Sequence, residues 1–284
     1  MVDTSRPSPE GPEFANWLKA VCGTSTDPFV RNSEADVARF CGLVRKLPSK
    51  YGWRFSSVEA YRTQMTKART VRDVNRLYWT DQARNVEAYS VMSLWRGHEL
   101  LRSGVRSLNH RELVAAAVTA RSLLEVAASF LLNANIIAKT FEELSFAADQ
   151  VVVSTEFEER VVKMIWGRRI DAPPDYLKQG NVLTAIQKLT RHPSATELLP
   201  KYEYLCELAH PNVIGNMRFW SHVDVVHDDG SEVLVFDSLA RSEVSREIAE
   251  SVLWAMGWSV VSLNNGLVLI QDSSVSLLRN LSEA

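Results

Sequence analysis

The sequence predicts a mostly α-helical bundle with two long central helices and one small β-hairpin near residues 217–237. Two observations carry this prediction. Residues 71–148 contain no proline, and apolar residues recur through them at helical intervals. Residues 217–237 instead alternate polar and apolar side chains on both sides of the turn-forming sequence HDDG, which is typical of a hairpin.

The first helices are predicted from their capping residues. Asn32 precedes a stretch that places Val37 and Phe40 on one face, so a helix is expected to begin there. Ser56 and Glu59 have the spacing of a capping box and predict the start of a second helix. The first long helix follows over about 71–107.

The second long helix is predicted over 110–148, which contains neither glycine nor proline. From 114 to 138 it is apolar on nearly all sides, which favours a central, buried position. Shorter helices are expected at about 155–167, 181–191 and 195–210, and helical spacing returns from 242 to near the end of the chain.

No shift in composition separates independent domains. A disordered lead is expected over 1–12, followed by a single helical domain over 13–284. Within this domain we distinguish a basic helical part, the bundle core, and the hairpin with the C-terminal helix, which span 13–70, 71–216 and 217–284.

The composition is that of a cytoplasmic protein. Apolar residues make up 46% of the 284 residues, charged residues 23%, and the net charge is −2. Three cysteines without CxxC spacing favour a reducing compartment. An uncharged stretch of 21 residues, 251–271, is long enough to span a membrane, but it contains the turn-forming sequence NNG. A buried terminal helix and no membrane contact are therefore expected.

A charged pair stands out in the most apolar helix. Arg121 and Glu125 are four residues apart, and charged side chains are rarely buried unless they are paired. We consider two interpretations: a buried structural ion pair, or one side of a polar pocket. In the second, the pair faces the later helix that ends at His210 and carries Glu207.

The pocket interpretation predicts a hydrolase or nuclease with a specific set of residues. The catalytic candidates are Arg121, Glu125, Glu207 and His210, and the pocket candidates are Tyr204 and Asn212. Neither a metal nor a cofactor is expected. Glu207-x-x-His210 is half of a di-iron ligand set, and the sequence has no second Glu-x-x-His.

A basic run suggests a second kind of site. Nine lysines and arginines lie between 45 and 76, against two acidic residues, and tyrosine, tryptophan and phenylalanine are interspersed among them. Cations contact phosphates and rings stack on bases, so the run predicts nucleic-acid binding. The candidate contacts are Arg54, Arg62, Lys67, Arg69, Arg72 and Arg76. The alternative is a solvated face whose charges pair with Glu142, Glu143, Asp149, Glu156, Glu158 and Glu159.

Two stretches resemble a known group of proteins. HRELVAAAVTARSLLEVAA (110–128) and YEYLCELAHPN (202–212) are similar to uncharacterised bacterial helical proteins that look like distant relatives of the HEPN family (higher eukaryotes and prokaryotes nucleotide-binding). The resemblance covers about 80–216. Many HEPN proteins are dimeric, metal-independent ribonucleases of defence systems with an Arg-x(4–6)-His motif.

That nuclease motif is missing from this chain. None of the six histidines has an arginine five to seven positions upstream. The resemblance therefore implies a non-catalytic or regulatory binding protein of the bacterial cytosol, acting in regulation or defence. The expected partners are RNA, a nucleotide or a protein, together with further copies of the chain.

Overall fold

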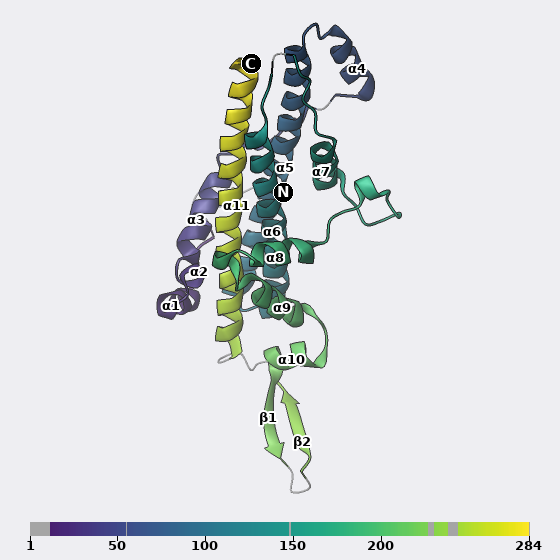
Figure 1. Cartoon of the computed structure of the whole chain (residues 1–284). Helices are drawn as coiled ribbons and strands as arrows, with labels where there is room; N and C mark the ends of the chain where they lie inside the picture. Colours follow the sequence, from purple (N-terminus) through teal and green to yellow (C-terminus); the bar gives the residue numbers. More distant parts are fainter. Residues whose placement is uncertain (1–11, 55, 148, 227–229, 238–243, 284) are drawn as a thin grey trace, which may run out of the picture. The chain divides into compact units, whose positions relative to one another are not determined.

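The chain folds as a mostly α-helical bundle, as the sequence predicts (Figure 1). The computed structural model describes residues 12–54, 56–147, 149–226, 230–237 and 244–283. The predicted lead up to residue 11 and the turn residues 227–229 lie outside this part of the chain.

The described chain divides into two compact units, where the sequence predicts one domain. Unit 1 comprises the described residues of 1–46, 96–128 and 186–262, and unit 2 comprises those of 47–95, 129–185 and 263–284. Three long helices each contribute a part to both units: α5 (Val71–Asn109), α6 (Leu113–Glu143) and α11 (Val244–Glu283).

Unit 1 adds short helices and a β-ribbon to its parts of the long helices. These elements are α1 (Asn16–Thr24), α2 (Pro28–Arg31), α3 (Ser33–Val44), α9 (Leu198–Ala209), α10 (Val213–Trp220), β1 (Ser221–Val226) and β2 (Glu232–Phe236). The two strands are antiparallel, with Ser221 opposite Phe236 and an irregularity between Val223 and Val225. Asp27 caps α2 by accepting hydrogen bonds from the backbone N–H groups of Phe29 and Val30.

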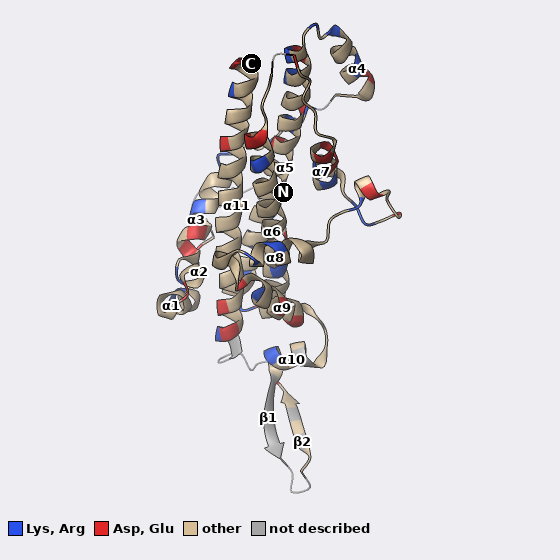
Figure 2. Ribbon diagram, viewed as in Figure 1, with Lys and Arg blue, Asp and Glu red and all other residues tan. Residues whose placement is uncertain are grey.

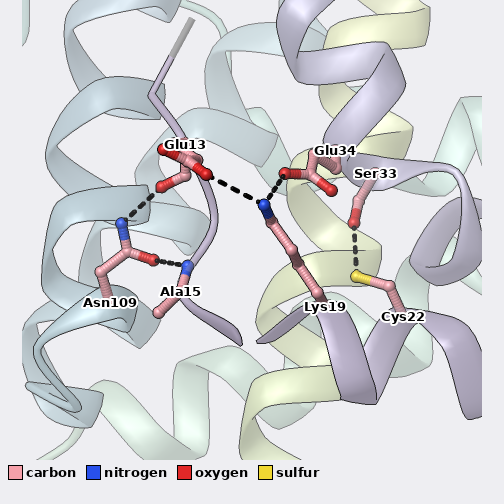
Figure 3. A network of polar contacts seen from close by, with 7 residues as sticks. All are labelled: Glu13, Ala15, Lys19, Cys22, Ser33, Glu34 and Asn109. Atoms are coloured by element: carbon pink, nitrogen blue, oxygen red, sulfur yellow. Dashed lines mark hydrogen bonds and ion pairs between the residues drawn. The ribbon is translucent and has the colours of Figure 1, made fainter. Parts of the chain in front are cut away.

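A polar network fixes the beginning of the described chain within unit 1 (Figure 3). The side chain of Asn109, at the end of α5, donates to the carbonyl of Glu13 and accepts from the N–H of Ala15, both at 2.8 Å. Lys19 reaches the carboxylates of Glu13 and Glu34 at 3.1 and 3.5 Å. The segment before α1 is thereby attached to α5 and α3.

A tight turn joins α5 to α6. Arg111 has a positive φ of 58°, and the N–H of Glu112 donates to the carbonyl of Ser107 at 2.8 Å. This is the pattern that ends a helix with a left-handed residue. It separates the two long helices within a few residues, and α6 ends at Glu143, before the predicted boundary at 148.

Unit 2 contains α4 (Val58–Lys67) and α7 (Thr155–Trp166), and its core is aromatic. Trp79 on α5 is fully buried and contacts Phe141 and Phe157, with ring centroids 6.2 and 5.8 Å away. The segment before α7 lies against α5, because Asn75 accepts from the N–H of Val152 at 2.8 Å and Trp79 donates to the Val152 carbonyl at 2.9 Å. The cap of α4 is Ser57, one residue after the predicted Ser56.

The NNG sequence lies inside α11 rather than in a turn. A Cβ atom on Gly266 would meet the Phe130 ring at 2.9 Å, so the glycine permits close packing against α6 in unit 2. Two helices, Leu113–Glu143 and Arg246–Glu283, are long and apolar enough to cross a membrane by length and composition alone. In their most apolar windows 50% and 72% of the residues are buried inside the protein.

Candidate functional site

The Arg121 cluster lies between α6 and α9 in unit 1. Arg121 Nε is 3.2 Å from Glu125 Oε1, an ion-pair distance, although the N–H is not aligned for a hydrogen bond. The Tyr202 hydroxyl donates to the same carboxylate oxygen at 2.9 Å, and the guanidinium lies 5.8 Å from the centre of the Tyr202 ring. The Arg121 and Glu125 side chains are 32% and 29% exposed, whereas the sequence predicts a buried pair.

The electrostatics of the cluster favour a permanent ion pair beside a neutral phenol. Burial raises the pKa of Tyr202, and its hydrogen bond to Glu125 raises it further. Burial lowers the pKa of Arg121, but its interactions with Tyr202 and the charge of Glu125 more than offset this, so that it is raised overall. Both raised pKa values favour the protonated forms of Tyr202 and Arg121.

The predicted residues at the end of α9 form a different structure. Glu207 accepts from the Asn212 side-chain amide at 2.8 Å, and Asn212 accepts from the Gly215 N–H at 2.6 Å. His210 is the exposed C-cap residue, and its N–H donates to the carbonyls of Cys206 and Glu207. These contacts join α9 to α10, which explains the helix end at His210.

Tyr204 lies away from the Arg121 cluster as well. Its hydroxyl donates to Glu247 on α11 at 3.1 Å, and the Arg218 guanidinium lies 5.9 Å from its ring centre and 3.7 Å from the Glu247 carboxylate. The structure thus brings Arg121 together with Glu125 and Tyr202. Glu207 instead contacts Asn212, and Tyr204 contacts Glu247.

Sequence reasoning missed Tyr202, although a signal was present. Tyr202, Leu205 and Leu208 recur at helical spacing and are all buried on the same helix. This stripe selects Tyr202 rather than Tyr204 as the tyrosine that faces inward. Among the residues that the structure describes, no group of three histidine, cysteine, aspartate or glutamate side chains could hold a metal ion.

Replacing Glu125 with alanine is expected to lower the free energy of unfolding by about 1 kcal/mol, because a partly exposed ion pair and one phenol hydrogen bond are lost together. For a chain of this size the melting temperature should fall by about 2–4 °C. Thermal denaturation measures the change. Glu143→Ala is the matched control, since the Lys139–Glu143 pair has the same spacing but is 75% and 67% exposed. Equal melting temperatures for both variants would contradict a stabilising role for the Arg121 cluster.

The basic segment, which we define as residues 54–76, lies in unit 2 on α4, on the first turns of α5 and on the residues beside them (Figure 2). All six of its cations are exposed. Among the described residues none of the six forms an ion pair with a carboxylate, and of the acidic partners considered in the sequence only Glu143 is paired, with Lys139. Arg72 donates to the carbonyl of Ser282.

The two carboxylates within the basic segment form no ion pair with its cations in the part of the chain that the structure describes. Asp73 accepts from the backbone N–H groups of Arg69 and Thr70, both at 3.1 Å, at the start of α5. The Thr70 hydroxyl and these N–H groups lower the pKa of Asp73, so its charge is committed to the helix end. Glu59 lies in the first turn of α4, where a negative charge suits the helix dipole.

The aromatic side chains near this segment are engaged inside unit 2. Trp53 donates to Asn85 at 3.1 Å, and its ring centroid lies 5.4 Å from that of Trp166. Burial, with the nearby Glu87 carboxylate, raises the pKa of Tyr51 to about 12. Burial also raises the pKa of Tyr61, helped by the charges of nearby carboxylates. Phe55 lies outside the described residues, and the rings that are described do not face solvent fully, as base stacking would require.

Comparison with known proteins finds no relative: no protein-family model matches the chain, and no curated protein or solved structure is significantly similar to it. Function is therefore inferred from the geometry of the chain itself.

Proposed function

We propose that the protein binds nucleic acid through the basic segment. The observation that carries this proposal is a run of six exposed cations within residues 54–76, none of which forms an ion pair with a described carboxylate. A solvated face in a stable protein usually intersperses both signs of charge. Here the two acidic residues lie at helix starts, and the cations stay available to a polyanion.

The physical basis of such binding is the release of counterions. Each phosphate neutralised by a lysine or arginine frees condensed cations, so affinity falls steeply with salt. Because the whole chain carries a net charge of −2, attraction would be local and would orient the nucleic acid toward the basic segment. Phosphate contacts of this kind do not read sequence.

An enzymatic role has less support. The hydrolase hypothesis needs Arg121 and Glu125 to meet Glu207 and His210, and the contacts support a structural role for each group instead. The wider proposal follows the sequence resemblance: a HEPN-like, regulatory or defence-related binding protein of the cytoplasm that associates with itself and needs no cofactor.

The test is fluorescence anisotropy with labelled RNA and DNA over a series of salt concentrations. Wild-type protein should bind with a steep salt dependence. The triple variant Arg62→Ala, Lys67→Ala, Arg69→Ala should bind more weakly, and the slope of log K against log salt should become shallower by about 2–3. These three side chains are exposed, so folding should be unchanged by circular dichroism.

The matched control is the triple variant Arg31→Ala, Lys188→Ala, Arg191→Ala, which removes the same charge from exposed positions in unit 1. It should bind as the wild type does. If both triple variants bind nucleic acid equally weakly, the loss of affinity reflects net charge alone. If the wild-type protein binds no nucleic acid at low salt, the proposed function is refuted.

A further inference from the structure

The loop that follows α7 exposes large apolar side chains. Trp166 ends α7 with 52% of its surface exposed, and Tyr176 and Ile170 are 53% and 74% exposed. We call residues 166–180 the 166–180 loop; it belongs entirely to unit 2. The exposure of Trp166 and Tyr176 contrasts with that of Tyr51, Trp53 and Tyr61 near the basic segment, which are half-buried.

Backbone hydrogen bonds close the loop upon itself. The N–H of Arg168 donates to the Leu177 carbonyl at 2.9 Å, and the N–H of Gln179 donates to the Arg168 carbonyl at 3.2 Å. Between them the chain reverses at Asp171 and Ala172, which both have positive φ, and a 3₁₀ turn (η1, Asp175–Leu177) carries Tyr176. Side chains positioned in this way lose less conformational entropy when they bind a ligand.

A contact between two tryptophans joins the loop to the basic segment. Trp53 lies against Trp166 with the ring planes tilted by 34°, and its indole N–H is held by Asn85. Arg54 follows Trp53 in the chain, and the exposed Arg168 follows Trp166 by two residues. The ring contact thus brings two segments of unit 2 together, each with an arginine within two residues of its tryptophan.

Three cations of the loop, Arg168, Arg169 and Lys178, outnumber its two carboxylates, Asp171 and Asp175. The ion pair between Arg168 and Asp171 is long, at 3.9 Å, and both side chains are more than half exposed, so it contributes little and can open. The nearest glutamate of α7 is Glu159, seven residues before Trp166, which is about 10 Å along the helix axis.

We propose that the 166–180 loop is a base-stacking platform and that the ligand is single-stranded nucleic acid. Trp166 and Tyr176 stack on unpaired bases, while Arg54, Arg168 and the basic segment contact phosphates. Bases are accessible for stacking only where the strand is unpaired. This inference rests on the proposed function and adds to it the class of nucleic acid.

The test compares substitutions of Tyr176, which is exposed enough to be replaced without disturbing the core. Tyr176→Leu keeps apolar bulk but loses the ring, and it should weaken binding to a single-stranded RNA by about tenfold. Tyr176→Phe keeps the ring and should bind as the wild type does. The salt slope should be the same in all three proteins, because stacking involves no counterion release.

Two further measurements sharpen the result. Wild-type protein should prefer the single strand to a duplex of equal length, and Ile170→Ala, on the same loop but without a ring, should bind RNA normally. The inference is overturned if Tyr176→Leu binds like the wild type, or if Ile170→Ala is weakened equally. A third outcome also overturns it: Tyr176→Leu binds RNA as the wild type does but no longer binds anionic phospholipid vesicles.

The design separates this inference from the proposed function. If the basic-segment variant loses RNA binding and Tyr176→Leu keeps it, only the stacking platform is refuted. If the wild-type protein binds no nucleic acid, the proposed function and the stacking platform are both refuted.

Discussion

Replacing Trp79 with alanine is expected to lower the free energy of unfolding by about 3–5 kcal/mol. The indole is fully buried on α5, where it contacts Tyr78, Phe141 and Phe157 within 6.2 Å between ring centroids. Its removal leaves a cavity in the aromatic core of unit 2. It also leaves the Val152 carbonyl without the indole N–H that it accepts.

Chemical denaturation followed by circular dichroism measures this loss. Trp79→Phe keeps a ring but not the hydrogen bond, so its free energy of unfolding should lie between those of the wild type and the alanine variant. The control is Met92→Ala, because Met92 lies on the same helix in the same unit and is exposed; it should change stability by less than about 0.5 kcal/mol. A loss below about 1 kcal/mol for Trp79→Ala would show that the aromatic core is not a main source of stability.

The second large effect is expected at Gly257 on α11. A Cβ atom there would lie 2.3 Å from the backbone oxygen of Phe29 and 3.1 Å from its carbonyl carbon. Backbone atoms of α2 can move only if the whole helix shifts. We therefore expect Gly257→Ala to lower the free energy of unfolding by about 2–3 kcal/mol, even though alanine favours helix by up to about 1 kcal/mol.

Gly104 on α5 provides the matched comparison within unit 1. Its added Cβ would meet the terminal methyl of Met256, which is the end of a flexible side chain and can turn aside. The gain in helix propensity then compensates, and Gly104→Ala should stay within about 1 kcal/mol of the wild type. Denaturation curves of the two variants test the pair directly. If both variants lose the same free energy of unfolding, the loss does not depend on which atom lies next to the added Cβ.

The helical content could be predicted from the sequence because spacing within a helix is local information. Contacts between distant segments could not be predicted from this spacing. The spacing of Arg121 and Glu125 indicates their pairing, but their tyrosine partner depends on how α9 is rotated about its axis, which selects Tyr202 over Tyr204. Their partial exposure likewise depends on what covers α6, which periodicity does not reveal.

The same limit of sequence-based prediction applies to the basic segment. Its charge is visible in the sequence, and so are the aromatic residues beside it. Whether a ring faces solvent depends on distant partners such as Trp166, which takes up one side of Trp53. The division into two units was also hidden, because it passes through continuous helices, for example between residues 95 and 96.

That division limits how the molecule can be taken apart. Each unit is assembled from three separate stretches of polypeptide, and α5, α6 and α11 run from one unit into the other. No single truncation yields either unit as an intact fragment, since every cut that separates them severs helices and leaves apolar faces without cover. Dissection of this protein therefore has to proceed by substitution within the full-length chain.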